Sequence, residues 1–186
     1  IKFHRQDSEA MMGSLFQTLF LLVPVVSSTF ASIGRLLKDM KTPGSIGTLI
    51  IDEAGQAQPQ MAVGALYRAR KAIIVGDPRQ VEPVVTDDLK LLKEAYEEPV
   101  LANYKDKSLS VQSCADIINP FGTFYDNGTD CPEWVGCPLL VHRRCISPMY
   151  DISNHISYQG IMKQQTLPPS ESEITSFIFN KSQWIN

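Results

Sequence analysis

The chain has 186 residues, of which 44% are hydrophobic and 20% are charged, the balance of a globular protein with a sizeable core. Its formal net charge of −3 argues against a broad basic face for nucleic acid, although a narrow groove with few cations stays open. The richest apolar run, residues 19–26, is too short for a membrane helix and contains Pro24, so we expect a soluble, cytoplasmic protein with no membrane partner.

Three apolar, β-branched runs in the first half of the chain predict strands, at residues 22–27, 48–51 and 72–75. Helix-period segments separate them, which is typical of an α/β fold. Because the runs are continuously apolar rather than alternating, we expect a parallel sheet whose strands are buried on both faces.

Two helices are predicted between these strands. The first is capped by Ser28 or Thr29, ends at Pro43 and Gly44, and carries one apolar face made of Ile33, Leu36, Leu37 and Met40. The second opens at Pro59 and continues through Met61, Leu66 and Tyr67.

The pattern loosens over residues 88–136, which we interpret as a connector rich in Asn, Gly, Asp and Pro towards its end. A new unit is then predicted from Pro138, with a strand at 139–141, a helix opened by Ser147 and Pro148 that runs through Ile152 and Ile156, and a strand at 174–179. The four cysteines, Cys114, Cys131, Cys137 and Cys145, form no C-x-x-C pair, so free thiols are favoured over zinc ligands or disulfides.

Two adjacent carboxylates, Asp52 and Glu53, follow the second predicted strand directly. Strand ends of this kind lie at the carboxyl edge of an open sheet, where ligands bind. Phosphoryl transfer needs a cation on the phosphate oxygens and a group that orients or deprotonates water. Asp52 suits the first task through Mg²⁺ and Glu53 the second, although acidic residues also form ordinary turns after strands.

The third predicted strand runs into Gly76, Asp77, Pro78, Arg79 and Gln80. A Gln at this edge can hydrogen-bond both a γ-phosphate and the attacking water. A solvated turn is the alternative, but two successive strand ends with complementary polar groups favour one shared site.

The sequences IDEAGQA at 51–57 and GDPRQVEPVV at 76–85 resemble motifs II and III of superfamily 1 helicases of the up-frameshift type. Residues 25–32 resemble motif Ic, which touches the nucleic-acid backbone in that family. Residues 138–145 and 148–158 resemble motif IV, at the start of the second RecA-like domain.

This resemblance implies roles for individual residues: Asp52 for Mg²⁺, Glu53 as general base and Gln80 as γ-phosphate sensor, with Asp77 beside the nucleotide. Arg144 falls where the family places an arginine that reaches the γ-phosphate across the domain cleft, and a guanidinium there would neutralise developing charge. A surface arginine paired with a carboxylate is the alternative for Arg144.

Ser28 and Thr29 have two compatible interpretations. Their hydroxyls can cap a helix, and the same helix N-terminus can hold a nucleic-acid phosphate.

The phosphate-gripping loop G-x-x-x-x-G-K-[ST] is absent from these residues, since no glycine precedes a lysine. Together with the start at Ile1, this predicts an internal piece of a P-loop NTPase with an incomplete RecA-like parallel sheet flanked by helices. We expect residues 1–87 to hold part of a first RecA-like domain, 88–136 the connector and 137–186 the start of a second, with the missing halves of both domains as partners.

The resulting hypothesis is an ATP- and Mg²⁺-dependent helicase or translocase that moves along a single strand of DNA or RNA. Without the phosphate loop and motifs V and VI, this chain alone is expected to be inactive. The alternatives are a nucleic-acid-stimulated ATPase that remodels complexes without unwinding, and a non-enzymatic module that is inert or depends on a partner.

Overall fold

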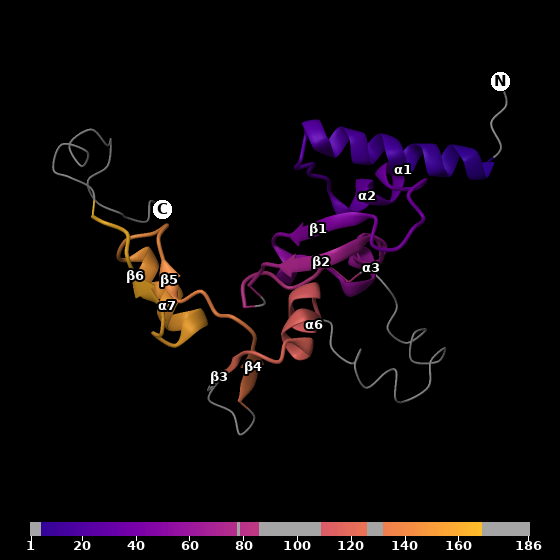
Figure 1. The fold of residues 1–186 in the computed structure, drawn as a ribbon. Coiled ribbons are helices and arrows are strands. Elements are labelled where there is room, and N and C mark those ends of the chain that lie inside the picture. Colours follow the sequence, from indigo (N-terminus) through magenta and orange to yellow (C-terminus); the bar gives the residue numbers. More distant parts are fainter. Residues whose placement is uncertain (1–4, 78, 86–108, 126–131, 169–186) are drawn as a thin grey trace, which may run out of the picture. The chain divides into compact units, whose positions relative to one another are not determined.

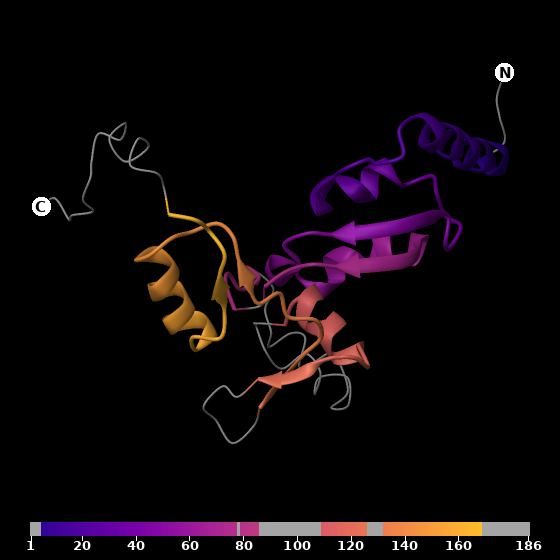
Figure 2. The same ribbon diagram turned by 60° about the vertical axis from the view of Figure 1, so that its left-hand side comes forward.

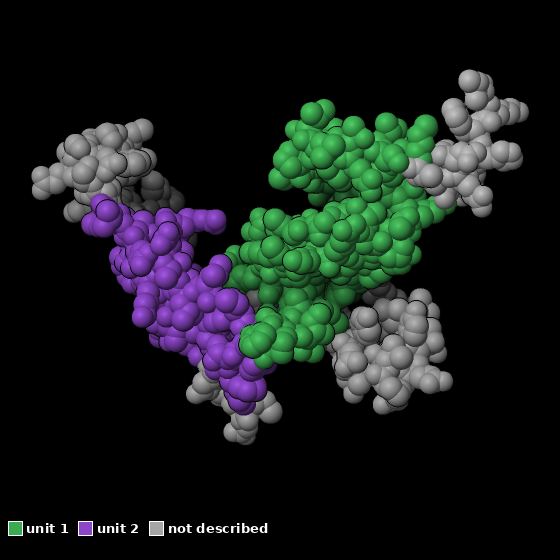
Figure 3. All heavy atoms as spheres, viewed as in Figure 1, with its two compact units in different colours: residues 1–121 green, residues 122–186 purple. Residues whose placement is uncertain are grey.

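A computed structural model describes residues 5–77, 79–85, 109–125 and 132–168. The chain forms two compact units, Ile1–Phe121 and Gly122–Asn186, which Figure 3 shows in separate colours. Each unit has its own small parallel sheet. The predicted α/β class with parallel strands and helices is therefore confirmed.

The first unit is built around the parallel pair β1 and β2, which run side by side in Figures 1 and 2. The register pairs Ile46 with Ala69 and Ile51 with Ile74. Parallel neighbours need a crossover, and α3 supplies it. In chain order the elements of this unit are α1 (Arg5–Leu22), α2 (Phe30–Leu36), β1 (Ile46–Ile51), the 3₁₀ turn η1 (Ala54–Gln56), α3 (Pro59–Arg68), β2 (Ala69–Ile74) and α6 (Val111–Ile118).

The predicted βαβ segment forms at the expected residues. β1 includes the strand expected at 48–51, and β2 includes residues 72–74 of the strand expected at 72–75. Pro59 occupies the first turn of α3, where its missing N–H is not needed. The face that α3 buries differs from the expected one, because Ala62 and Ala65 are buried whereas Met61 and Tyr67 are about half exposed. Small side chains let α3 lie close to the strands it contacts.

The core of this unit lies at the carboxyl end of β1. It consists of Ile51, Ala54, Ala57, Ala62 and Val111, with Phe30, Leu49 and Ile74 packed against it. The turn that follows β1, which contains η1, therefore packs against both α3 and α6.

The expectation that the strands are buried on both faces is wrong for the described residues. Ile50 and Ile73, which pair in register, are 64% and 51% exposed. The sheet has only two strands in the described part of the chain, and its helices leave this pair of side chains uncovered.

The strand expected at residues 22–27 is also wrong. α1 continues through Leu22, and the amide of Val23 still donates to the carbonyl of Leu19 at 2.7 Å. Pro24 then ends the helical bonding because it has no N–H. The following residues to Thr29 are exposed and pair with no strand among the described residues, so their β-branched composition has no sheet to join.

α2 forms close to the expected place, with Thr29 at the N-cap position. It ends at Leu36, before Pro43 and Gly44. Leu37 and Met40 from the predicted apolar face are buried just beyond it, whereas Leu36 is exposed.

The second unit contains an antiparallel pair, β3 (Thr123–Tyr125) with β4 (Glu133–Val135), and a parallel pair, β5 (Val141–His142) with β6 (Lys163–Gln164). α7 (Met149–Tyr158) connects β5 to β6. It starts after Pro148, as predicted.

α7 is anchored by a buried polar network rather than by its expected apolar face. The amide group of Asn154 accepts from the N–H of Met162 at 3.1 Å and donates to the same residue's carbonyl at 3.2 Å, while the hydroxyl of Tyr150 donates to that carbonyl as well. Ile152 and Ile156 are exposed. The strand expected at 174–179 lies outside the described residues.

None of the described helices combines the length and apolar character that crossing a membrane would require.

Candidate active site

The candidate site is formed by the two loops that leave the carboxyl ends of β1 and β2. Backbone pairing continues beyond the strands, because the N–H of Val75 donates to the carbonyl of Ile51 at 2.8 Å and the N–H of Ala54 donates to the carbonyl of Val75 at 2.9 Å. The two loops, which begin at Asp52 and at Gly76, therefore start side by side at one edge of the sheet.

Asp52 and Glu53 are both exposed to solvent at this edge. Oδ1 of Asp52 accepts the N–H of Glu53 at 3.0 Å, and Oδ2 accepts no hydrogen bond from the described residues. Oε2 of Glu53 accepts from Nε2 of Gln56 at 3.4 Å. Each carboxylate thus keeps one oxygen for an external cation or water.

Glu53 has a left-handed backbone, with φ 54° and ψ 38°, and it immediately precedes η1. Non-glycine residues adopt this region rarely, and such residues concentrate at functional sites. The turn directs the chain from β1 into the core at Ala54.

The second loop is organised by Asp77. Its Oδ1 accepts the N–H of Arg79 and its Oδ2 accepts Nε2 of Gln80, both at 2.9 Å. Asp77 therefore closes a side-chain-to-backbone turn, and it also accepts a hydrogen bond from the amide nitrogen of the exposed Gln80. Asp77 can thus orient the Gln80 side chain.

Two further residues support the site, and no sequence motif pointed to either of them. Gln58 is 6% exposed and its Nε2 donates to the carbonyl of Val84 at 2.8 Å. The N–H of Val111, the first residue of α6, donates to the carbonyl of Ala57 at 2.9 Å. The loop that carries Glu53 is therefore fixed by Val75, by residue 84 and by α6.

Ser28 and Thr29 precede α2 as predicted, but neither side chain caps it. The Thr29 side chain makes no capping hydrogen bond, and the Ser28 hydroxyl donates to the carbonyl of Thr29 at 3.3 Å. The expected capping role is therefore wrong, and both side chains are exposed.

Arg144 belongs to the second unit, where it follows β5 and is exposed. Its guanidinium has no hydrogen bond or ion pair with the described residues, whereas Nε of the neighbouring Arg143 donates to Gln165 at 3.2 Å. Pairing with a carboxylate, the alternative for Arg144, does not occur within the described part of the chain.

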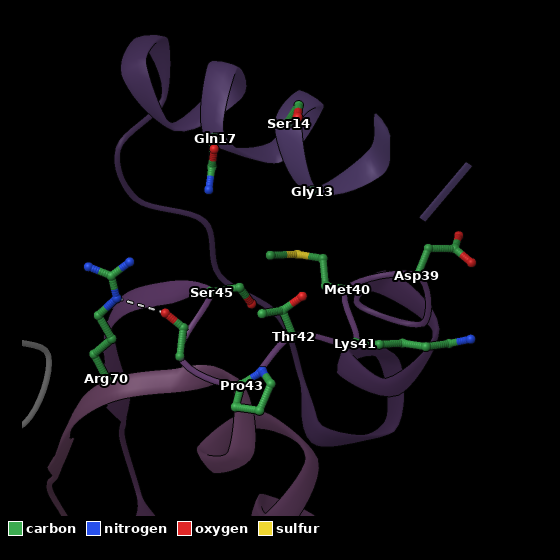
Figure 4. A pocket seen from close by; sticks show the side chains of 11 residues that line it. Gly13, Ser14, Gln17, Asp39, Met40, Lys41, Thr42, Pro43, Ser45 and Arg70 are labelled. Atoms are coloured by element: carbon green, nitrogen blue, oxygen red, sulfur yellow. Dashed lines mark hydrogen bonds between the residues drawn. The ribbon is translucent and has the colours of Figure 1, made fainter. Parts of the chain in front are cut away.

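A cavity of about 420 Å³ lies at the other end of the sheet and is separate from the candidate site. Figure 4 shows Arg70, at the start of β2, donating through Nε to the carbonyl of Gly44 at 2.7 Å at its rim. Ser14 and Gln17 of α1 line the opposite side. The cavity faces the amino ends of the strands, so it lies away from the carboxylates at their carboxyl ends.

Among the described residues, no three His, Cys, Asp or Glu side chains are grouped as metal ligands. Magnesium in nucleotide sites is commonly held by one or two carboxylates together with phosphate oxygens and water. The free Oδ2 of Asp52 fits such a site.

A parallel strand pair with two carboxylates after one strand and an Asp–Gln turn after the next is the arrangement that the motif resemblance predicts. Residues 2–88 match the family model described as "AAA domain". The chain is 30% identical over 92 residues to the mouse (Mus musculus) protein "Probable helicase senataxin" and 29% identical over 85 residues to its human (Homo sapiens) counterpart. These comparisons confirm the resemblance to superfamily 1 helicases that the motifs indicate.

The aligned regions cover 47% and 43% of this chain and about 3% of the length of each relative. No solved structure matches the chain.

Proposed function

We propose that the protein carrying this chain hydrolyses ATP and uses the energy to move along a single strand of nucleic acid. The observation that supports this most directly is the backbone pairing of residues 51, 54 and 75, which brings the Asp52–Glu53 loop and the Asp77–Gln80 loop to one sheet edge. The similarity to two probable helicases points the same way.

In this proposal Asp52 holds Mg²⁺ through its free Oδ2, and the cation would supply charge neutralisation on the phosphate oxygens. Glu53 accepts a proton from the attacking water through Oε1. Gln80 contacts the γ-phosphate and that water. Asp77 orients the Gln80 side chain by accepting a hydrogen bond from its amide nitrogen.

Arg144 is proposed to reach the γ-phosphate from the second RecA-like domain, which would couple closure of the cleft to hydrolysis. Its exposed guanidinium, unpaired among the described residues, supports this role. Ser28 and Thr29 are proposed to contact a phosphate of the nucleic acid, DNA or RNA, through hydroxyls that no capping bond engages.

The test is Glu53→Gln in the full-length protein. Loss of a positioned general base lowers turnover by about 10²–10⁴-fold. We therefore expect nucleic-acid-stimulated ATP hydrolysis to disappear while ATP binding, measured by titration calorimetry, persists. Unchanged hydrolysis in this variant would refute the assignment.

A second candidate function is supported by the absence of the phosphate-gripping loop from these 186 residues. The chain alone would then be an inert or partner-dependent module. Titration of the chain with ATP and Mg²⁺ tests this second candidate, since tight binding would contradict an inert module. A strand-displacement assay on the full-length protein separates a helicase from an ATPase that only remodels complexes.

A further inference from the structure

The loop that carries Gln80 is attached to the loop that carries Glu53 at both of its ends. Its beginning, Gly76, lies against the backbone of η1, and its end, Val84, is bound by Gln58. Gln80 lies between these two attachments along the chain.

The first attachment depends on glycine for reasons of space. A Cβ atom at Gly76 would lie 2.5 Å from the nitrogen of Gly55 and 2.6 Å from the nitrogen of Ala54, distances that real Cβ atoms essentially never show. Both obstructing atoms belong to the backbone of the buried turn directly after Glu53, so a side chain at residue 76 would have to push the two loops apart.

The second attachment is a single, partly buried hydrogen bond. Nε2 of Gln58 donates to the carbonyl of Val84 at 2.8 Å, and Oε1 of the same side chain accepts from Gln60 at 2.7 Å. Gln58 is buried, so its amide has little access to water as an alternative partner.

We propose that Gly76 and Gln58 are positioning residues that fix the distance between Glu53 and Gln80. The inference rests on the proposed function, because it concerns how a base and a phosphate sensor on separate loops share one triphosphate. Neither Gly76 nor Gln58 touches the reacting atoms in this scheme. A misplacement of about 1 Å between reacting groups can lower turnover by about 10²-fold.

The experiment measures ATP hydrolysis by the full-length protein in the presence of single-stranded nucleic acid. It compares the wild type with the variants Gly76→Ala, Gln58→Met and Gly47→Ala. Gly47 is the matched control, since it lies in β1 and a Cβ there meets no atom within 4 Å. Glu53→Gln is included to test the proposed function separately.

We expect Gly76→Ala and Gln58→Met to lower kcat by about ten- to a hundredfold with KM for ATP changed less than about twofold, and Gly47→Ala to behave as the wild type. A general weakening of the fold would instead lower the amount of active protein, which active-site titration detects. Should Gly76→Ala fail to fold, Gln58→Met decides, because it removes the hydrogen bond to Val84 without introducing a backbone clash.

Two results overturn the inference without affecting the proposed function. One is a kcat within about twofold of the wild type for both variants while Glu53→Gln is inactive, which leaves the proposed function intact. The other is a rise in KM at unchanged kcat, which would mean that these residues serve ATP binding. If Glu53→Gln hydrolyses ATP normally, the proposed function fails and the positioning role fails with it.

Discussion

Glu53 has a left-handed backbone that costs a non-glycine residue roughly 1–2 kcal/mol. Two hydrogen bonds hold it there, from its own N–H to Asp52 and from the N–H of Ala54 to Val75. The proposed base is thus kept in an unfavourable conformation by neighbours on both sides, which is consistent with selection for the position of its carboxylate rather than for stability.

Glycine at this position should relieve that cost while abolishing hydrolysis. We expect Glu53→Gly to be more stable than Glu53→Ala by roughly 0.5–1 kcal/mol, since both variants lose the carboxylate but only glycine adopts positive φ freely. The free energy of unfolding, from urea denaturation followed by circular dichroism, gives the comparison.

Val63, which is 61% exposed in the middle of α3, provides the control for this pair. Val63→Gly should be less stable than Val63→Ala by about 1 kcal/mol, the usual penalty of glycine in an exposed helix interior. Equal stability of the Gly and Ala variants at residue 53 would show that the left-handed turn carries no strain.

At the scale of elements, α6 links a distant part of the sequence to the candidate site. Val111 is 4% exposed and packs with Ala54 and Ala57, and its N–H is bonded to Ala57. Ser110 caps the helix by accepting from the N–H of Ser113 at 3.0 Å. The helix is therefore fixed at its first turn, next to the loop that carries Glu53.

Val111→Ala should lower the free energy of unfolding by about 2 kcal/mol, because it opens a cavity beneath this loop. The matched substitutions Ile117→Ala and Ile118→Ala remove larger side chains from the same helix, but these are 71% and 81% exposed, so each should change stability by less than about 0.5 kcal/mol. Chemical denaturation of the three variants tests this, and a loss at the exposed positions equal to that at Val111 would mean that α6 packs differently.

The elements that the sequence predicted are those with strong local signals. β1 and β2 follow from continuous apolar runs, and α3 follows from Pro59 at its first turn. Residues 22–27 carried the same apolar signal as β1, but a strand also needs a neighbour to accept its hydrogen bonds. α6 was hidden within the expected connector, because its burial depends on contacts with the turn after β1, far away along the chain.

Some residues of the candidate site could likewise be predicted from the sequence, whereas others could not. That Asp52, Glu53 and Gln80 follow adjacent parallel strands could be predicted, since carboxyl ends of parallel strands share one edge. Gln58 and Gly76 could not be assigned from sequence, because the partner of Gln58 lies 26 residues further on and the crowding at Gly76 comes from the backbone of another loop.

At the scale of the whole chain, the net charge of −3 limits how these 186 residues can hold nucleic acid. The proposed contacts of Ser28 and Thr29 are hydroxyl groups, which displace no counterions. If this chain holds nucleic acid through these hydroxyls, as proposed, we expect its binding of a single strand to depend weakly on salt, with a slope of log K against log [salt] no steeper than about −3. Fluorescence anisotropy across a salt series measures the slope, and a value steeper than about −5 would indicate an extended basic track instead.

The turn after β1 contains two kinds of residue, exposed and buried, which alternate along a short stretch of the chain. Asp52, Glu53 and Gln56 face solvent, whereas Ala54, Ala57 and Gln58 are enclosed. In a library of single substitutions, and under the proposed function, changes of the first kind should lower turnover far more than they lower the cellular level of the protein. Changes of the second kind would reduce the level itself, so that the chemistry of this turn can evolve without endangering the fold that supports it.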